Sequence, residues 1–372
     1  MMQEKSPVSE FPGPPAAELV YDDAVKARTD HLYDRVRDVI PEAEWPLHAP
    51  LIDAINRLKA GRNAVILAHN YMTPEIFNCV GDITGDSLKL ARVAAKAEQD
   101  VIVQAGVHFM AETAKILSPE KTVLIPDLRA GCSLAESITG EDVRRIRQAY
   151  PEFPIITYVN TSAEVKAESD ICCTSSNAVP VAEAIAKQWN TDTVIFIPDQ
   201  FLARNVASQT DLKVLTWDGE CEVHDKFTLA EIEQLRIEHP EAKIITHPEC
   251  PPEVVRASDF AGSTGAMIAY VTEQKPREAI LITECSMSDN VAVANPATRF
   301  VRPCNLCPHM KRINLTNIYD ALREMKHRVE VDPATARRAR ESLQAMLDLP
   351  MPDQPPAFDP TRDEKPAPFV QI

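Results

Sequence analysis

Residues 64–70 read AVILAHN, a short apolar run that ends in two polar residues. Two later stretches repeat this pattern, PIITYVN at 154–160 and AKIITHPE at 242–249. Continuous apolar runs of this length are typical of parallel strands that are buried on both faces. The polar residues that end the three runs are spaced by 89 positions (158 − 69 and 247 − 158), and they are His69, Tyr158 and His247.

Further apolar runs and helix openings follow the same period. Four more runs occur at 100–106 (DVIVQAG), 122–127 (TVLIPD), 192–199 (DTVIFIPD) and 279–284 (AILITE). Short polar turns open helical patterns at Ser87, Ser175 and Thr264, which are 88 and 89 residues apart. A period near 89 is too long for a solenoid unit and fits a small domain. The sequence therefore predicts an α/β protein of three similar three-layer αβα domains around a pseudo-threefold axis.

The repeat also predicts the limits of the domains. We expect an N-terminal arm and helix at 1–50, αβα domains at 51–131, 132–220 and 221–306, a cysteine and helices returning to domain 1 at 307–345, and a Pro-rich tail at 346–372. Residues 1–20 are polar and contain four prolines, so they are expected to form a loose arm. Residues 350–372 are expected to be disordered or to lie along the surface.

Composition excludes some classes of partner. The chain has 372 residues and a formal net charge of −16, whereas nucleic acid and anionic membranes both require a basic face. No apolar run approaches the ~20 residues of a membrane span, and the first residues lack the apolar stretch of a secretory signal. We therefore expect a cytoplasmic protein with no nucleic-acid or membrane partner.

Three of the nine cysteines form the first candidate site. Cys132, Cys221 and Cys307 are spaced by 89 and 86 residues, and each follows the last strand of a repeat. Equivalent positions meet near the axis if the three domains close into a triangle. Three thiolates leave one iron of a cubane cluster without a protein ligand, whereas electron carriers usually use four cysteines for each cluster. Such an open iron can act as a Lewis acid on a substrate oxygen.

Other interpretations of these cysteines stay open. Structural zinc prefers four ligands that come in close pairs, and Cys304-x-x-Cys307 is the only such pair among the candidates. A dithiol switch at that pair is a further alternative. A disulfide framework is not expected in a reducing cytosol.

The helix openings form a second candidate site. Ser87, Ser175 and the pair Ser263-Thr264 stand where helices are expected to begin. Hydroxyl residues in such places usually serve only as N-caps. Three convergent helix starts can also bind an anion. A cavity of this kind suits a substrate with two carboxylates, or with a carboxylate and a phosphate.

Polar residues after the strands form a third candidate site. They are His69, Asn70 and Tyr71 in the first repeat, Tyr158 and Asn160 in the second, and His247 and Glu249 in the third. A lone histidine after a strand is more often structural, but a triplet at one repeat position favours function. Histidine and glutamate can move protons, and tyrosine can donate to a developing oxyanion. His224, three residues after Cys221, is either a surface residue or part of the same cavity.

At these residues the chain strongly resembles quinolinate synthase, the A-protein family of de novo NAD biosynthesis. The matching motifs, in order over about residues 50–325, are LAHNYMTPEI (67–76), GDSLKLAR (85–92), AGVHFMAETAKIL (105–117), IPDLRAGCSLAESI (125–138), YVNTSAEVKAESDICCTSSNA (158–178), WDGECEVHDKF (217–227), THPEC (246–250), AGSTGAM (261–267) and CPHMKRINL (307–315). Many motifs in one order make the resemblance specific. It implies three αβα domains with a central [4Fe-4S] cluster, and condensation of iminoaspartate with dihydroxyacetone phosphate to quinolinate, phosphate and water.

The resemblance also implies roles for individual residues. Cluster ligands are expected at Cys132, Cys221 and Cys307. Substrate contacts are expected at His69, Tyr71, Ser87, Tyr158, Asn160, Ser175, His247, Glu249, Ser263 and Thr264. We expect Tyr71, His224, His247 and Glu249 to take part in catalysis. A functional link to the L-aspartate oxidase that supplies iminoaspartate is also implied.

One departure from the family pattern concerns the third ligand. Some members have C-x2-C-x2-C before Pro-x-Met, but Val301 occupies the first of these places here. We assign the ligand to Cys307, which directly precedes Pro308, and Cys304 remains a competitor. Two other functions are considered: a diphthamide-forming cluster enzyme, against which the HNY, YVN and HPE motifs argue, and a cluster-based sensor, for which no basic signalling element is present.

Overall fold

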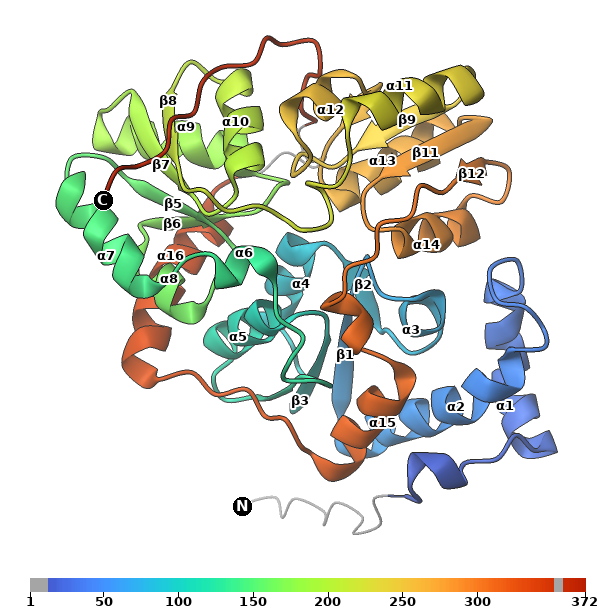
Figure 1. The fold of residues 1–372 in the computed structure, drawn as a ribbon. Helices are drawn as coiled ribbons and strands as arrows, with labels where there is room; N and C mark the ends of the chain where they lie inside the picture. Colours follow the sequence, from blue (N-terminus) through green and yellow to red (C-terminus); the bar gives the residue numbers. More distant parts are fainter. Residues whose placement is uncertain (1–12, 351–356) are drawn as a thin grey trace.

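Three parallel sheets organise residues 13–350 and 357–372, the part of the chain that the computed structural model describes (Figure 1). The first has the order β2-β1-β3-β4 and contains β1 (Ala64–His69), β2 (Ile83–Gly85), β3 (Val101–Ala105) and β4 (Thr122–Leu124). The second has the order β6-β5-β7-β8 and contains β5 (Ile155–Tyr158), β6 (Ile171–Cys173), β7 (Thr193–Ile197) and β8 (Lys213–Thr216). The third has the order β10-β9-β11-β12 and contains β9 (Lys243–Thr246), β10 (Phe260–Ala261), β11 (Glu278–Ile282) and β12 (Arg299–Val301). All neighbouring strands are parallel.

Each sheet belongs to a repeat in which a helix precedes every strand. The helices of the first repeat are α2 (Trp45–Arg62), α3 (Pro74–Cys79), α4 (Ser87–Ala94) and α5 (His108–Leu117). Those of the second are α7 (Gly140–Ala149), α8 (Ala163–Glu168), α9 (Ala178–Trp189) and α10 (Gln200–Gln209). Those of the third are α11 (Leu229–Glu238), α12 (Pro252–Arg256), α13 (Thr264–Gln274) and α14 (Ser286–Ala294). The same element order and strand order in all three confirm the predicted fold of three similar αβα domains.

The strands form where the sequence places apolar runs. Every residue of β3 and of β7 is buried, as expected for parallel strands covered by helices on both faces. Helix starts are specified by polar side chains. Thr139 and Thr228 begin the first helices of the second and third repeats with the same capping box, in which the threonine and an acidic residue three positions later bond each other's backbone N–H.

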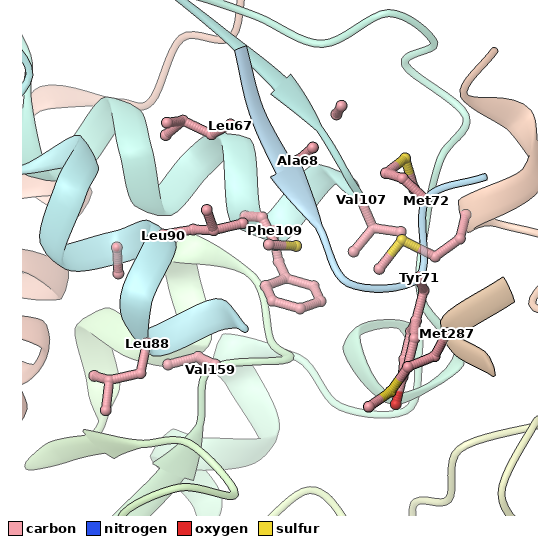
Figure 2. Close-up of a cluster of buried hydrophobic side chains, with 14 of the residues drawn as sticks. Leu67, Ala68, Tyr71, Met72, Leu88, Leu90, Val107, Phe109, Val159 and Met287 are labelled. Carbon is pink, nitrogen blue, oxygen red and sulfur yellow. The ribbon is translucent and has the colours of Figure 1, made fainter. Parts of the chain in front are cut away.

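Part of the hydrophobic core lies directly behind the strand ends. Figure 2 shows Leu88 and Leu90 of α4, Phe109 of α5 and Val159, the residue after β5, within one buried cluster. Val159 comes from the second repeat and the other three come from the first. Packing between repeats therefore holds the strand ends of two domains at a fixed separation.

The remaining helices lie outside the three repeats. They are η1 (Ala16–Glu18), α1 (Asp23–Val36), α6 (Ser133–Glu136), η2 (Met310–Arg312), α15 (Leu315–Glu324) and α16 (Pro333–Asp348). Helix α15 returns to domain 1 and packs on α2. Helix α16 packs mainly on α8 and β6 of the second domain and also contacts α5 of the first. Its buried Ala339, Leu343 and Met346 form the apolar face that makes this contact.

The last residues of the chain lie along the second and third domains (Figure 1). Phe358, which is buried, donates its backbone N–H to Ala261 O at 2.9 Å, and Val370 donates to Thr216 O at 2.8 Å. Residues 357–372 thus follow the surface, which was one of the two expectations for the tail. Residues 1–12 of the expected arm and 351–356 of the expected tail lie outside the described residues.

The domain limits predicted from the repeat stay predictions. Strands β1–β4 fall within 51–131, β5–β8 within 132–220 and β9–β12 within 221–306, while α2 begins before residue 51. Among the helices in the described part of the chain, none combines the length and the apolar composition that crossing a membrane requires.

Candidate functional site

One cavity lies where the three domains meet, and its space amounts to about 710 Å³, part of it open to solvent. Strands β1, β5 and β9 end at its wall with His69, Tyr158 and, one residue beyond β9, His247. All of the predicted site residues except Asn70 and Ser263 line this cavity. Ser263 caps α13 by accepting a hydrogen bond from Ala266 N at 3.3 Å, so its hydroxyl serves the helix rather than the cavity.

The helix-start residues reach the cavity in two ways. Ser87 and Thr264 are the first residues of α4 and α13, whereas Ser175 lies in the turn three residues before α9. Two hydrogen bonds join these turns across domain boundaries. Asn70 Nδ2 donates to Thr264 Oγ1 at 2.9 Å, and Ser176 Oγ donates to Asp86 Oδ2 at 2.9 Å. The wall of the cavity is therefore held together by contacts between domains.

Three cysteines share another part of the cavity wall, and their sulfurs have matching surroundings. Cys132 Sγ accepts backbone N–H groups of Leu134 and Ala135, and Cys221 Sγ accepts those of Val223 and His224. In the same way, the residues two and three positions after Cys307 donate to its sulfur. Each cysteine thus stands at the start of the same kind of turn, and its sulfur receives N–H groups that favour the thiolate.

Burial acts against ionisation of these thiols when no cation is present. It raises the pKa of Cys132 to about 12, and it raises the pKa of Cys221 and Cys307 above the ordinary value, although the N–H donors oppose this change. A bound metal reverses such a preference, since its positive charge stabilises the coordinating thiolates. Three partly buried sulfurs that each receive N–H groups therefore fit a metal or iron–sulfur group.

Cys304 has a different environment from Cys307. Its side chain is exposed and does not line the cavity. Its thiol lies beside that of Cys285 rather than beside Cys132 or Cys221. The position of Cys304 therefore gives no support to it as a competitor of Cys307.

Glu249 is the central charged group of the cavity. Its Oε2 lies 2.7 Å from His224 Nδ1, and its Oε1 accepts the Tyr158 hydroxyl at 2.5 Å. Burial alone would raise the pKa of Glu249, but the neighbouring His247 and His224 and the two hydrogen bonds together lower it below its usual range. The carboxyl is therefore ionised at neutral pH and can only accept hydrogen bonds, which places a proton on His224 Nδ1.

Two further histidines are neutral donors. Burial lowers the pKa of His69 to about 4 and that of His247 to about 3, against the opposing effect of Glu249. His69 Nδ1 accepts the backbone N–H of Tyr71 at 3.2 Å, and His247 Nδ1 accepts that of Glu249 at 3.4 Å. In a neutral ring the proton is then on Nε2. Both rings can therefore donate from Nε2, and His247 Nε2 lies 3.2 Å from Ser175 Oγ.

The two tyrosines are neutral phenols. Burial, followed by the charge of Glu249, raises the pKa of Tyr71 and of Tyr158 well above 10. The hydroxyl of Tyr71 lies 2.6 Å from Thr283 Oγ1, and Thr283 Oγ1 lies 2.9 Å from His224 Nε2. A continuous row of polar contacts therefore runs from Tyr71 through Thr283, His224 and Glu249 to Tyr158.

A smaller donor set overlaps the cysteine site. Ligand atoms of Cys221, His224 and Glu249 all lie within 4.8 Å of one another and could hold a single metal ion. Because it shares Cys221 with the three-cysteine site, a metal ion here and a group on all three cysteines would compete for one sulfur. The structure thus contains a possible metal site on this wall of the cavity.

Several residues of the site were missed from the sequence. Those that line the cavity include Asp86, Phe109, Ser133, Thr174, Ser176, Glu222 and His309. Asp86 precedes Ser87 and Ser176 follows Ser175, so their positions beside predicted site residues could have identified them. Thr283 does not line the cavity; it directly follows β11 as Pro198 follows β7, and this equivalence offered no signal that would have singled it out.

Comparison with known proteins is consistent with this geometry. The family model described as quinolinate synthetase A protein matches residues 53–348. A protein of Caulobacter vibrioides named quinolinate synthase is 58% identical over 340 residues, which cover 91% of this chain and 93% of the relative. Quinolinate synthase 2 of Mesorhizobium japonicum is 62% identical over 316 residues, 85% of this chain and 96% of the relative. The chain therefore belongs to the quinolinate synthetase A protein family.

Proposed function

We propose that this chain is a quinolinate synthase that condenses iminoaspartate with dihydroxyacetone phosphate to give quinolinate, phosphate and water in NAD biosynthesis. The observation that carries the proposal is that one cavity contains the three cysteines together with the polar residues at the strand ends and helix starts of all three domains. The names of the relatives support the same activity. Its substrates are small molecules, and an L-aspartate oxidase is the expected supplier of iminoaspartate.

The cofactor of the proposed enzyme is a [4Fe-4S] cluster held by Cys132, Cys221 and Cys307. The three partly buried sulfurs and their repeated N–H donors support this assignment. With three protein ligands, such a cluster supplies an iron with an open position that acts as a Lewis acid on a substrate oxygen.

The chain's own residues would bind the carboxylates of iminoaspartate. His69 and His247 can donate from Nε2, and Ser175 and Thr264 add hydroxyl donors near helix starts. Asn160 also lines the cavity, and its Oδ1 has no hydrogen-bond partner among the described residues, so it is free to accept the substrate's N–H. Neutral donors of this kind hold two carboxylates without requiring lysine or arginine in the cavity.

Proton transfer would use the row from Tyr71 to Tyr158. Isomerisation and dehydration each require removal of a proton from carbon or nitrogen and protonation of a leaving oxygen. A carboxylate with a lowered pKa is a weak base, so we propose that Glu249 acts mainly by accepting the His224 Nδ1–H and orienting that ring toward Thr283. Tyr71 and Tyr158, as neutral phenols, would donate to oxygens that develop negative charge.

The test combines a product assay with iron analysis. Anaerobically prepared protein, supplied with iminoaspartate and dihydroxyacetone phosphate, is expected to form quinolinate. Cys132→Ala, Cys221→Ala and Cys307→Ala should each lose iron, sulfide and activity, whereas Cys304→Ala should keep all three.

Two results would contradict the proposal. Loss of the cluster in Cys304→Ala with retention in Cys307→Ala would overturn the third ligand. Protein with a full complement of iron and sulfide that forms no quinolinate would overturn the function and favour a sensor.

A further inference from the structure

Lys166 is a buried cation next to the wall of the cavity that the second domain supplies. It belongs to α8, is fully buried and does not line the cavity itself. Its Nζ donates to Val159 O at 2.8 Å and also to Thr161 O. Asn160, the residue between these two carbonyls, does line the cavity. We propose that Lys166 is a positioning residue that holds Asn160 in place for the nitrogen-bearing substrate, an inference that rests on the proposed function.

The position of Lys166 in α8 explains how its ammonium reaches this loop. Ser162 is the N-cap of the helix, and Lys166 is the fourth residue after it. Helical side chains tilt toward the N-terminus of their helix. The long side chain of Lys166 can therefore extend back past the helix start, where it meets the carbonyls of residues 159 and 161. One helix thus holds the backbone on both sides of Asn160.

Phe109 supplies a further contact for the ammonium. The centre of its ring lies 5.4 Å from Lys166 Nζ, a separation typical of a cation–π contact. Phe109 belongs to α5 of the first domain and lines the cavity. A buried charge needs such partners, since burial without them is costly. The ammonium therefore joins two parts of the cavity wall, one from each of two domains.

The side chain of Asn160 depends on its backbone for a fixed place. Its buried Oδ1 has no hydrogen-bond partner among the residues that the structure describes. In the proposed function this oxygen accepts the N–H of iminoaspartate. An acceptor that is already in place avoids the cost of ordering it when the substrate binds. Without the ammonium, the two carbonyls beside Asn160 would lose their donor, and the loop would shift to satisfy them.

Kinetics of Lys166→Met test this role, because methionine keeps an unbranched side chain and removes the charge. With the cluster loaded, we expect KM for iminoaspartate to rise about 10-fold, the effect of losing one well-placed hydrogen bond. The kcat and the KM for dihydroxyacetone phosphate should stay within about 3-fold, because only ground-state binding of one substrate is lost. Iron and sulfide content of the variant serves as a control.

Lys115 provides a matched control. Its Nζ also donates to two backbone carbonyls, those of Pro119 at 3.2 Å and Lys121 at 3.1 Å, but it does not line the cavity and neither do they. Lys115→Met should therefore leave kcat and both KM values as in the wild type.

Two further measurements show whether Lys166 acts through Asn160. In a double-mutant cycle, Lys166→Met combined with Asn160→Ala should have a KM for iminoaspartate within about 2-fold of that of Asn160→Ala alone. Amide hydrogen exchange of a peptide that covers residues 158–162 should be several-fold faster in Lys166→Met than in the wild type, and unchanged in Lys115→Met. If Lys166→Met does not yield folded protein with its cluster, Lys166→Gln takes its place under the same criteria.

The results that overturn the inference are distinct from those that overturn the function. An unchanged KM for iminoaspartate, additive losses with Asn160→Ala, or unchanged exchange at 158–162 would each refute the role of Lys166 while the wild type still forms quinolinate. An equal rise in both KM values would show that the buried charge acts on any anion, and would also refute it. A cluster-loaded wild type that forms no quinolinate would refute the proposed function, and this inference would fall with it.

Discussion

Acid should destabilise this protein through two buried histidines, His69 and His247. Their side chains are 6% and 3% exposed, and burial lowers their pKa values to about 4 and about 3 from 6.5. Below pH 6.5 the unfolded chain takes up protons that the folded chain does not yet bind. Their contribution to stability is therefore complete above pH 6.5 and is lost as the pH falls.

The size of the effect follows from the two pKa values. Between pH 7 and pH 5 each histidine should cost about 2 kcal/mol of unfolding free energy, and the two together about 4 kcal/mol. The measurement is urea unfolding at a series of pH values on cluster-free protein, since acid also destroys clusters. In His69→Gln and in His247→Gln, the loss between pH 7 and pH 5 should be about 2 kcal/mol smaller than in the wild type.

An exposed histidine provides the matched control. His31 is on the surface of α1, so His31→Gln should leave the pH dependence of unfolding as in the wild type. If His247→Gln and His69→Gln lost as much stability on acidification as the wild type, the two rings would not be buried neutral donors. The carboxylate-binding role proposed for them would then lose its physical basis.

Three further substitutions test other contacts. Glu249→Gln removes the charge that holds the proton on His224 Nδ1, and kcat should fall by about 10²–10⁴ with the cluster intact; full turnover would exclude a role in proton transfer. Lys166 is fully buried and donates to the carbonyls of Val159 and Thr161. Lys166→Met should therefore cost about 1–3 kcal/mol in urea unfolding, and an unchanged midpoint would argue against that anchoring. Phe358→Ala should release residues 357–372 and speed tryptic cleavage in that segment several-fold, whereas an unchanged digestion pattern would contradict the docking.

The sequence was informative wherever the repeat is regular. The 89-residue spacing of His69, Tyr158 and His247 correctly predicted three sheets. A parallel strand that is buried on both faces is a continuous apolar run. Polar functional residues follow such a strand at its carboxyl end, where ligands bind. The same spacing brought Cys132 and Cys221 to one cavity. These predictions needed only local pattern and the assumption that equivalent positions converge.

The remaining features of the fold and of the site depend on long-range contacts that the spacing of residues in the sequence does not encode. Thr283 reaches Tyr71 over 212 residues and His224 over 59, and an isolated threonine after a strand has no pattern of its own. Helix α16 packs mainly on α8 of the second domain and also contacts α5 of the first, an arrangement that its apolar face alone does not encode. Ser263 and Thr264 are adjacent at a helix start, and only the backbone geometry decides that the first caps the helix and the second faces the cavity.

The shared element order of the three domains has a consequence for how such a site can arise. Three separate copies of one domain, assembled as a ring, could offer only three identical side chains at each position around the axis. In a single chain each domain can carry a different residue at an equivalent position, and here the strand ends hold His69, Tyr158 and His247, while Cys132, Cys221 and Cys307 are identical. A cavity of this kind can place three identical cysteines around its axis and still bind the two ends of an asymmetric substrate with different side chains.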